Sequence, residues 1–337
     1  MKKTFLAAAA TAVIASLALA GCAGENATPG AGAGGEWSKS TLSLDFATYN
    51  PLSLIIKEQG WIEDTLGDDV AVTWTQSLGS NKANEGLRAG ALDVGSTAGS
   101  AALLARANGS PIQTIGIYTQ PEWSALVTLP GSGIESVADL RGKTVAVTIG
   151  TDPYFFLLRA LQANGLSEVY IQNLQHADGG VALVNGSVDA WSGLDPMMAA
   201  HELNDGVELF YRNVDFNTYG FLNATEDFIT NNADLAQVVA DAYEKARAWA
   251  LENPDETAQL LADVSGLDLE VATVVLLERT VIDLDFAPGA AQYSVLEVVG
   301  PIQVANGDIP SQDQADAALE TLFNTTFADA ADPSRVG

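Results

Sequence analysis

Residues 144–154 read Thr-Val-Ala-Val-Thr-Ile-Gly-Thr-Asp-Pro-Tyr, which predicts a short apolar strand, a glycine turn and the start of a helix. Gly150 permits the tight turn, and Thr151 and Asp152 can cap the helix that follows. Pro153 suits the first turn of that helix. The free N–H groups at a helix start, together with the positive end of its dipole, can hold an anion. A plain capped helix is the alternative interpretation of the same residues.

Two further turns of this kind follow predicted strands. They are Leu78-Gly-Ser-Asn81 and Gly95-Ser-Thr-Ala-Gly-Ser100, and their polar side chains include Ser80, Asn81, Ser96 and Thr97. Open α/β sheets bind ligands at the carboxyl ends of their strands, so three such turns together predict a binding site. None of the turns ends in Gly-Lys-Ser/Thr, so they do not predict a nucleotide-binding P-loop.

Short strands and helices alternate from Thr41–Phe46, which has a period of two, to Tyr219–Asn223, and Pro51 can open a helix that ends at Gly60. From about residue 232 the pattern becomes helical, with helices predicted at Ala233–Glu252, Glu256–Val264, Leu269–Arg279 and Ala315–Phe323. This succession predicts an α/β protein with parallel sheets and helices on both faces. A length of 337 residues fits roughly two domains of about 150 residues each. Chain order therefore predicts two α/β lobes and a helical finish, with the strand at Ala125–Leu129 in the first lobe.

The composition excludes several classes of protein. Apolar residues make up 47% of the chain and charged residues 17%, so it can bury a large core. A net charge of -28 repels nucleic acid and anionic membrane surfaces, but does not exclude a small anion held by local N–H donors. One cysteine and two histidines leave almost no soft metal ligands. We therefore expect no metal, no cofactor and no nucleic-acid partner.

Catalytic motifs are not evident. His176 and His201 belong to neither an HExxH nor a Gly-x-Ser-x-Gly motif, and His176, which lies next to Ala-Asp, is interpreted as a satisfied surface or capping residue. Trp123 and Trp191 could wall a pocket, although packing is the commoner role of an aromatic side chain. Asp195 could meet a ligand amine or cap the helix that follows. The sequence predicts a binding protein rather than an enzyme.

The N-terminus predicts export. Lys2 and Lys3 precede an apolar run from Phe5 to Ala20, and Leu19-Ala-Gly-Cys22 is typical of a lipobox. This predicts a signal peptide at 1–21, lipidation of Cys22 and a flexible tether through residue 39. The protein would then be anchored by its lipid to the outer face of the bacterial cytoplasmic membrane, or on the periplasmic side. An ordinary N-terminal anchor helix is the alternative.

Several segments together carry a family resemblance: Tyr49–Pro51, Asn84–Gly95, Ala105–Gly109, Ser136–Gly150, Phe156–Leu161, Asn185–Trp191 and Leu194–Pro196. They resemble solute-binding proteins of ABC importers, and among them the nitrate, taurine and aliphatic-sulfonate group. The resemblance implies a two-lobed periplasmic-binding-protein type II fold that binds ligand in the interlobe cleft by hinge closure. Its first lobe would contain residues 40–128 and 224–337, and its second lobe residues 129–223.

The resemblance also implies a ligand site. It places Asn50, Ser80, Asn81, Ser96 and Thr97 on the first lobe, Trp123 and Ser124 near the crossover, and Thr151, Asp152, Trp191 and Asp195 on the second lobe. Donors near Ser96, Ser124 and Thr151 are expected to hold a sulfonate, and Asp195 would meet an amine if the ligand has one. Taurine needs both ends, whereas an alkanesulfonate needs only the first. Arg88 and Arg159 are expected at the surface, so no arginine is assigned to the anion.

The implied function is the binding subunit of an ABC importer, a monomer that captures taurine or another aliphatic sulfonate and delivers it to permease subunits. Binding of nitrate or of a carboxylate, aromatic ones included, stays open, as does a surface sensor without a permease. A relative of the same fold makes the thiamin pyrimidine, which needs a donated histidine and lysine-bound pyridoxal phosphate. An exported chain lacks a supply of that cofactor, so this enzyme is disfavoured.

Overall fold

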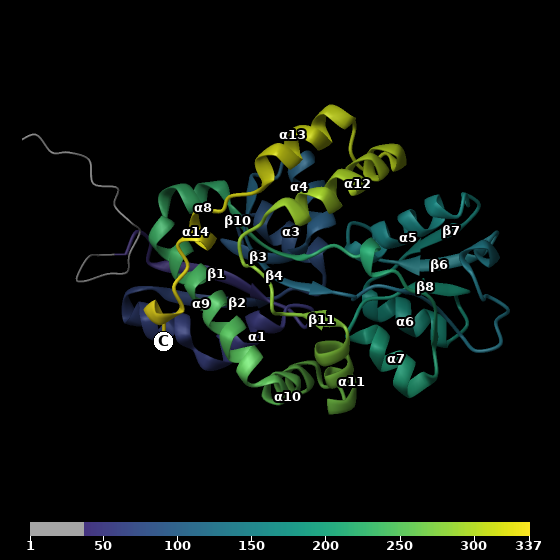
Figure 1. Ribbon diagram of the computed structural model, residues 1–337, viewed down its shortest axis with the longest axis horizontal. Coiled ribbons are helices and arrows are strands. Elements are labelled where there is room, and N and C mark those ends of the chain that lie inside the picture. The colour runs from purple at the N-terminus through teal and green to yellow at the C-terminus, as the bar shows by residue number, and fades with distance from the viewer. Residues whose placement is uncertain (1–36) are drawn as a thin grey trace, which may run out of the picture.

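The computed structural model describes residues 37–337, which form two α/β lobes, each built around one β-sheet (Figure 1). The predicted signal peptide, Cys22 and the tether up to residue 36 lie outside the described residues. Within the described range, no helix combines the length and the apolar character needed to cross a bilayer. The mixed α/β architecture with two sheets agrees with the sequence prediction.

The first sheet has the strand order β11-β4-β10-β3-β1-β2. Its strands are β1 (Thr41–Phe46), β2 (Ala71–Gln76), β3 (Val94–Ala98), β4 (Ile112–Pro121), β10 (Gly220–Thr225) and β11 (Thr280–Val281). β1 is parallel to β2 and β3, whereas β10 is antiparallel to β3 and β4. Leu42 and Leu44 point into the core, which is the period-two pattern that predicted β1.

The second sheet has the strand order β7-β6-β8-β5-β9. Its strands are β5 (Leu126–Thr128), β6 (Thr144–Val147), β7 (Tyr170–Asn173), β8 (Ala190–Ser192) and β9 (Glu208–Tyr211). β6 is parallel to β7 and β8, and β5 is antiparallel to β8 and β9. Val145–Val147 are fully buried, as the apolar run that precedes Gly150 predicts.

Two strands lie in the sheet opposite to the one expected. β5 pairs in the second sheet and β10 in the first, so the chain crosses between the sheets at residues 122–125 and 212–219. Each of these strands comes directly after a crossing and pairs antiparallel in the sheet of the next lobe. Chain order instead groups each strand with the elements that precede it, so it assigns both to the wrong lobe. We therefore propose lobe boundaries at these two crossings, in place of boundaries after residue 128 and after residue 223.

Helices cover both sheets. In the described residues they are α1 (Pro51–Gln59), α2 (Trp61–Leu66), α3 (Ser80–Arg88), α4 (Gly99–Ala107), α5 (Asp152–Ala163), α6 (His176–Val184), α7 (Met197–Asp205), α8 (Glu226–Asn231), α9 (Ala233–Glu252), α10 (Pro254–Ser265), α11 (Leu269–Thr273), α12 (Ala290–Asn306), α13 (Gln312–Leu322) and α14 (Thr326–Asp329). The helix predicted at Leu269–Arg279 is α11 followed by a π turn at Val274–Glu278. α12 was not predicted, because Pro301 lies inside it and proline usually ends a helix.

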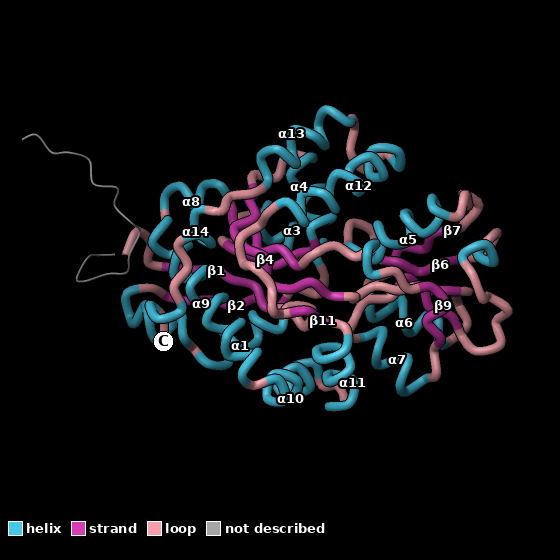
Figure 2. The backbone as a smooth tube through the Cα atoms, viewed as in Figure 1, coloured by secondary structure: helices cyan, strands magenta, loops and turns pink. Residues whose placement is uncertain are grey.

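The helical region after β10 packs mainly on the first lobe. α9 lies against α1 and α2, and α12 and α13 lie against α4 (Figure 1). Figure 2 shows the strands of each lobe between layers of helices. α12 and α11 also reach α5 and α7 of the second lobe. The tail therefore closes the first core and adds contacts between the lobes.

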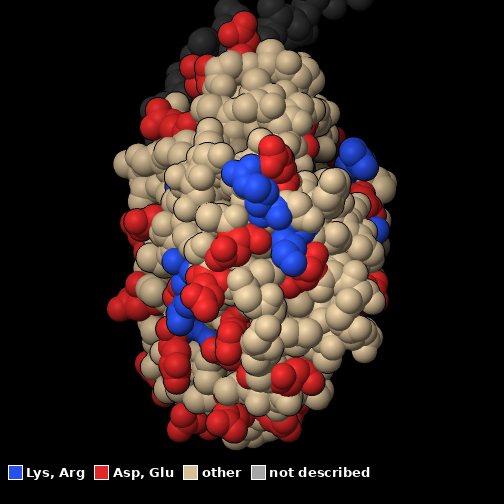
Figure 3. All heavy atoms as spheres, turned by 90° about the vertical axis from the view of Figure 1, so that its right-hand side faces the viewer, with Lys and Arg blue, Asp and Glu red and all other residues tan. Residues whose placement is uncertain are grey.

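Acidic side chains predominate on the outer face of the second lobe, with a few basic side chains between them (Figure 3). On this face the many Asp and Glu residues of the sequence are interspersed with a few Lys and Arg residues. Such a surface offers no extended basic stripe for a polyanion on the side that Figure 3 shows.

Candidate functional site

A small cavity lies where the two lobes meet. Its lining residues are Tyr49, Ser80 and Ala98 of the first lobe, Trp123 of the first crossing, and Thr151, Asp152, Pro153, His176 and Leu194 of the second lobe. The cavity measures about 10 Å³, which is room for about one water molecule. A larger ligand can enter only if the lobes move apart, which is the motion of a hinged two-lobed protein.

Four helices begin at this cavity. α3, α5 and α6 begin with Ser80, Asp152 and His176, which line it, and α4 begins directly after the lining residue Ala98. The first N–H groups of a helix have no partner within it, and each start carries about half a positive charge. Each lobe supplies two of these starts, and at α4 the Gly99 and Ser100 N–H groups already donate to the Tyr219 carbonyl and to Thr218 Oγ1, so α4 contributes its dipole. Their convergence makes the cavity suited to an anion.

His176 is the most unusual residue of the lining. Only 1% of its surface is exposed, and neither ring nitrogen has a hydrogen-bond partner among the described residues. The ring reaches the first lobe, since a Cβ atom at Gly79 would lie 3.1 Å from Nε2. Burial lowers the pKa of His176 to about 3, so the ring is neutral and has one N–H to donate. The interpretation of His176 as a satisfied surface or capping residue is therefore wrong.

Asp152 connects both lobes and both crossings. Oδ1 accepts hydrogen bonds from Ser100 Oγ (2.5 Å) and Thr218 Oγ1 (2.8 Å). Oδ2 accepts from Trp123 Nε1 (2.7 Å) and the Thr218 N–H (2.8 Å). Ser100 belongs to the first lobe, and Trp123 and Thr218 belong to the two crossings. These four donors occupy the carboxylate, so it holds segments together instead of offering free oxygens to a ligand.

A second buried carboxylate joins the lobes at Asp195. Its Oδ2 lies 3.2 Å from Arg279 Nη1, and Oδ1 accepts the Ala199 N–H at 2.9 Å. Arg279, which follows the π turn, also pairs with Glu202 of α7. Burial raises the pKa of Asp195 to about 6, although Arg279 opposes the shift. The carboxylate predicted to meet a ligand amine is therefore already paired with a guanidinium.

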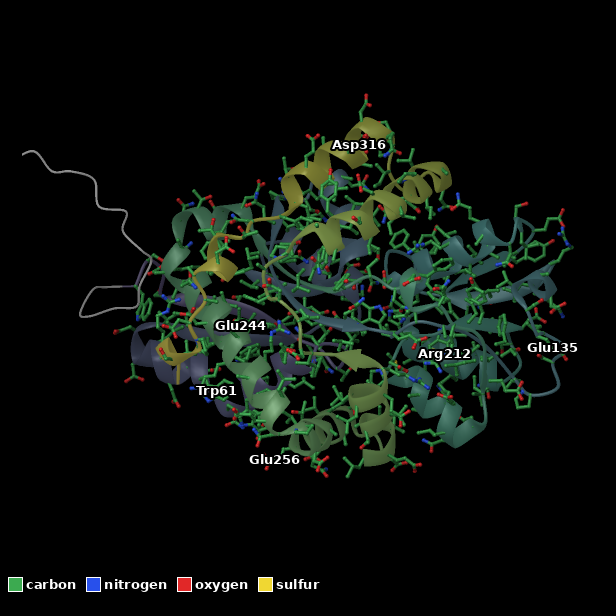
Figure 4. The ribbon with its side chains drawn as sticks, viewed as in Figure 1. Trp61, Glu135, Arg212, Glu244, Glu256 and Asp316 are labelled. Atoms are coloured by element: carbon green, nitrogen blue, oxygen red, sulfur yellow. The ribbon has the colours of Figure 1, made fainter. Side chains whose placement is uncertain are left out.

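A more exposed ion pair lies beside this one. Arg212 donates to both carboxylate oxygens of Glu122, at 3.0 and 2.7 Å, and the Glu122 N–H donates to the Arg279 carbonyl at 2.7 Å. Figure 4 shows Arg212 on the part of the second lobe near β11. Because the Arg212 side chain is 47% exposed, water screens this pair.

Four of the eleven predicted site residues line the cavity: Ser80, Trp123, Thr151 and Asp152. The hydroxyl of Ser80 accepts the Ala98 N–H at 2.9 Å, and that of Thr151 donates to the Thr148 carbonyl at 2.6 Å. The donors that remain for a ligand are the N–H groups of both residues, at the starts of α3 and α5, and the O–H of Ser80, whose oxygen only accepts.

Three predicted residues are engaged inside the first lobe instead. Asn50 caps α1 and donates to the Tyr243 hydroxyl at 2.9 Å. Ser96 donates to Asp45, with 3.0 Å between Oγ and Oδ2, and Thr97 accepts from Asn223 at 2.7 Å. These contacts hold the carboxyl ends of β1 and β3 in place beneath the cavity.

Asn81, Ser124 and Trp191 lie outside the lining, and each has a buried polar atom without a partner among residues 37–337. These atoms are Asn81 Oδ1, Ser124 Oγ and Trp191 Nε1. Trp191 packs in the core of the second lobe, where a Cβ at Gly179 would lie 2.7 Å from Nε1. Asn81 lies beside His176, because both approach Gly79 closely.

Comparison with known proteins agrees with this architecture. Residues 54–257, more than half of the chain, match the family described as NMT1/THI5 like. The chain belongs to the NMT1/THI5-like family. One relative is the "Putative aliphatic sulfonates-binding protein" of Escherichia coli (strain K12). It is 31% identical to this chain over 212 residues, which cover 62% of this chain and 66% of the relative. A protein of the same name from Bacillus subtilis (strain 168) is 31% identical over 235 residues, or 68% and 70%.

Solved structures confirm the two-lobed fold of the NMT1/THI5-like chain. The alkanesulfonate-binding protein SsuA from Xanthomonas axonopodis pv. citri, bound to MOPS, superposes with a TM-score of 0.74 at 23% identity, covering 83% of this chain and 98% of that one. The fold also occurs in the nitrate-binding protein NrtA from Synechocystis (TM-score 0.68, 13% identity, 86% and 87% covered). It occurs too in the desulfurization enzyme DSZB (TM-score 0.62, 15% identity, 86% and 98% covered). The fold alone does not choose among these functions.

A larger groove of about 450 Å³ lies next to the cavity of this NMT1/THI5-like protein. It is lined by Asn81, Asn84, Glu85, Arg88, Leu104, Ala105, Asn108, Ser110, Gly150 and Asp308. Asn81 and Gly150 adjoin the cavity residues Ser80 and Thr151 in the chain, so the groove leads away from the helix starts. Leu104 and Ala105 give the groove an apolar side beside its amides, Arg88 and two carboxylates, so it can take an alkyl chain as well as a polar group.

Two candidate functional residues, His176 and Arg279, were not among those predicted from the sequence. His176 gave no signal beyond its place next to Ala-Asp, and its burial depends on Gly79, nearly 100 residues away in the chain. Arg279 lies at the end of a predicted helix, 84 residues from Asp195. Only the family's two-lobed arrangement, which brings the tail to the second lobe, could have indicated that contact.

Proposed function

We propose that this protein is the extracytoplasmic binding subunit of an ABC importer and captures an aliphatic sulfonate between its lobes. The convergence of four helix starts on the buried, unpaired His176 is the observation that carries the proposal. A sulfonate stays ionised in water at every physiological pH and offers three oxygens to such donors. The names of the two relatives at 31% identity support the same ligand class.

In the proposed complex the sulfonate lies between the starts of α3 and α4 on one side and α5 and α6 on the other. The N–H groups near Ser80 and Thr151 are the donors nearest to the cavity. The Ser124 hydroxyl, whose Oγ has no partner among residues 37–337, can donate to a sulfonate oxygen as the lobes open and close again. The rest of the ligand extends into the groove beside Asn81 and Gly150.

We infer that an alkanesulfonate without an amine is preferred over taurine. Asp195 is the carboxylate assigned to the amine, and Arg279 already neutralises it at 3.2 Å. A ligand ammonium would have to displace this buried guanidinium, which would leave Arg279 and Glu202 to rearrange. A ligand with a neutral chain requires no such exchange.

The predicted signal peptide and lipobox support the location. Lipidated Cys22 would hold the protein at the outer face of the membrane, and the tether would let the closed, loaded form reach permease subunits as a monomer. Adjacent permease and ATPase genes would support import. Their absence would favour the alternative of a surface sensor with the same pocket.

Thermal unfolding with a panel of anions tests the proposal. The panel contains ethanesulfonate, taurine, propionate, nitrate and benzoate. A ligand at 100 times its Kd adds about 2.7 kcal/mol to the stability, which is a rise of several degrees in the melting temperature. We expect the largest rise with ethanesulfonate and a smaller one with taurine. A rise with propionate or nitrate alone would overturn the sulfonate assignment and leave the fold untouched.

The enzyme alternative finds less support at this site. A lysine-bound cofactor needs a lysine that faces the pocket, and the lining residues include none. The lysines at positions 39, 82 and 143 form ion pairs on the surface. Turnover assays with ethanesulfonate, in which the ligand is recovered unchanged, would agree with binding alone.

A further inference from the structure

We propose that His176 binds the sulfonate directly and takes up a proton from solvent when the anion binds. The inference rests on the proposed function of the cavity and adds to it a specificity-determining residue and a dependence of ligand affinity on pH. It is carried by the geometry of the ring, which lies at the meeting point of both lobes with two unused nitrogen atoms.

An unpaired buried imidazole is costly for the fold. A buried donor or acceptor without a partner loses its hydrogen bonds to water and gains nothing in return. His176 leaves both of its ring nitrogens in this state, whereas His201 pairs with Asp205 at 2.6 Å between Nδ1 and Oδ2. Within residues 37–337, one histidine thus has a hydrogen-bond partner and the other has none. The ligand-free protein is therefore less stable than it would be with His176 hydrogen-bonded, and an anion bound at the ring would supply the missing hydrogen bond.

The charge of the bound anion changes the preferred state of the ring. In the free protein, burial keeps His176 neutral, with a pKa of about 3. A sulfonate within hydrogen-bond distance favours the imidazolium, so the pKa rises on binding. Between the two pKa values, binding takes up one proton, and the affinity therefore increases as the pH falls. A neutral ligand would lack this coupling.

Other titratable groups surround the ring and must be separated from it. Asp152 of α5 and Tyr49 share the cavity lining, α3 carries Lys82 and Glu85, and His176's own helix carries Asp178. α7, which packs on α6, adds His201, Glu202 and Asp205, and Asp195 precedes α7 in the chain. Burial raises the pKa of Asp45 to about 7 and that of Asp195 to about 6, so these two carboxylates also titrate in the range of interest. The contribution of His176 to the pH dependence of binding is therefore obtained as the difference between wild type and a variant that lacks only this ring.

The test compares the full protein with His176→Gln and His201→Gln, using ethanesulfonate as the probe at pH 8 and pH 5. We expect calorimetric titration to show tighter binding by wild type at the lower pH, by up to about tenfold per pH unit below the raised pKa. His201→Gln should behave like wild type. His176→Gln should bind at least about tenfold more weakly and lose most of the pH effect, because an amide donates a hydrogen bond but takes up no proton.

Two further measurements exclude a merely structural role. His176→Leu should raise the melting temperature of the ligand-free protein while weakening ligand binding, because it removes two unsatisfied buried atoms. Since the chain has two histidines, imidazole NMR signals of His201→Gln report His176 alone. We expect that signal to shift to the protonated form when ethanesulfonate is added at pH 5.

The outcomes are separable. If wild type and His176→Gln bind ethanesulfonate with equal affinity at both pH values, the role of His176 is overturned and the proposed function stands. If wild type binds no sulfonate, the proposed function fails and the inference fails with it. A fall in melting temperature for His176→Leu would also contradict the role assigned to the ring.

Discussion

Asp152 and Asp195 both lie buried where the two lobes meet, but different kinds of partner hold them. Four uncharged donors from the first lobe and both crossings surround Asp152, which itself begins a helix of the second lobe. Asp195 instead shares the charge of Arg279 with Glu202. Hydrogen bonds from rigid backbone and indole groups fix a geometry, whereas an ion pair can be weakened by protonation. The Asp152 contacts therefore suit a permanent hinge, and the Asp195 contacts suit a releasable link.

The largest expected effect comes from breaking the Asp152 contacts. Asp152→Ala removes four hydrogen bonds to a charged group and leaves Trp123 Nε1 and the Thr218 N–H buried without an acceptor. We expect a loss of about 5 kcal/mol in the free energy of unfolding, measured with urea. Asp152→Asn keeps one acceptor oxygen and should lose less. Equal, small losses for both variants would show that the carboxylate does not hold the hinge.

Arg279→Ala should have the next largest effect. It leaves Asp195, which is 2% exposed, without its guanidinium, and a buried charge without a partner costs about 3 kcal/mol. Asp195→Leu combined with Arg279→Met removes both charges and should recover much of that loss. If the double variant is less stable than Arg279→Ala alone, the link contributes more than charge neutralisation.

The pH dependence of stability sharpens the comparison. The pKa of Asp195 in the folded protein, about 6, lies above its ordinary value of 3.8, so folding favours the protonated form. Its contribution to stability is fully present below about pH 4 and is lost as the pH rises through 6. Unfolding of wild type and Asp195→Asn should therefore diverge by about 2 kcal/mol between pH 4 and pH 7. Asp45 titrates in both proteins and cancels in the difference.

Arg212→Ala should have the smallest effect. Its pair with Glu122 is bidentate but nearly half exposed, so we expect a loss of at most about 1 kcal/mol. Addition of 0.5 M salt should reduce even that loss, because screening weakens exposed pairs. A loss as large as that of Arg279→Ala would mean that the outer pair, and not the buried one, links the lobes.

Local features of the fold were predictable from the sequence. Pro51 and Gly60 mark the ends of α1, and the strand, Gly150 turn and Pro153 correctly predict β6 and the start of α5. These signals depend on neighbouring residues alone. The sheet that receives β5 or β10 depends on pairing with strands far along the chain, so alternation could not reveal it. The family resemblance supplied the two-lobed fold that alternation left open.

The site was predictable to a smaller extent. Ser80 and Thr151 follow glycine turns at strand ends, and both line the cavity, whereas their contact with a ligand stays a prediction. Ser96 occupies a similar turn, yet Asp45 accepts its hydroxyl proton, a contact that no spacing indicates. His176 became visible only when Gly79 and the second lobe were placed side by side. Long-range contacts decide which polar groups are left free, and the sequence pattern does not contain them.

A crystal structure of the protein grown with ethanesulfonate, with the sulfur located by its anomalous signal, tests the central claim most directly. We predict one sulfonate sulfur between the starts of α3, α4, α5 and α6, with a ring nitrogen of His176 within hydrogen-bond distance of an oxygen. A sulfonate bound at Arg88 in the outer groove, with the cavity closed around His176 as before, would contradict the account.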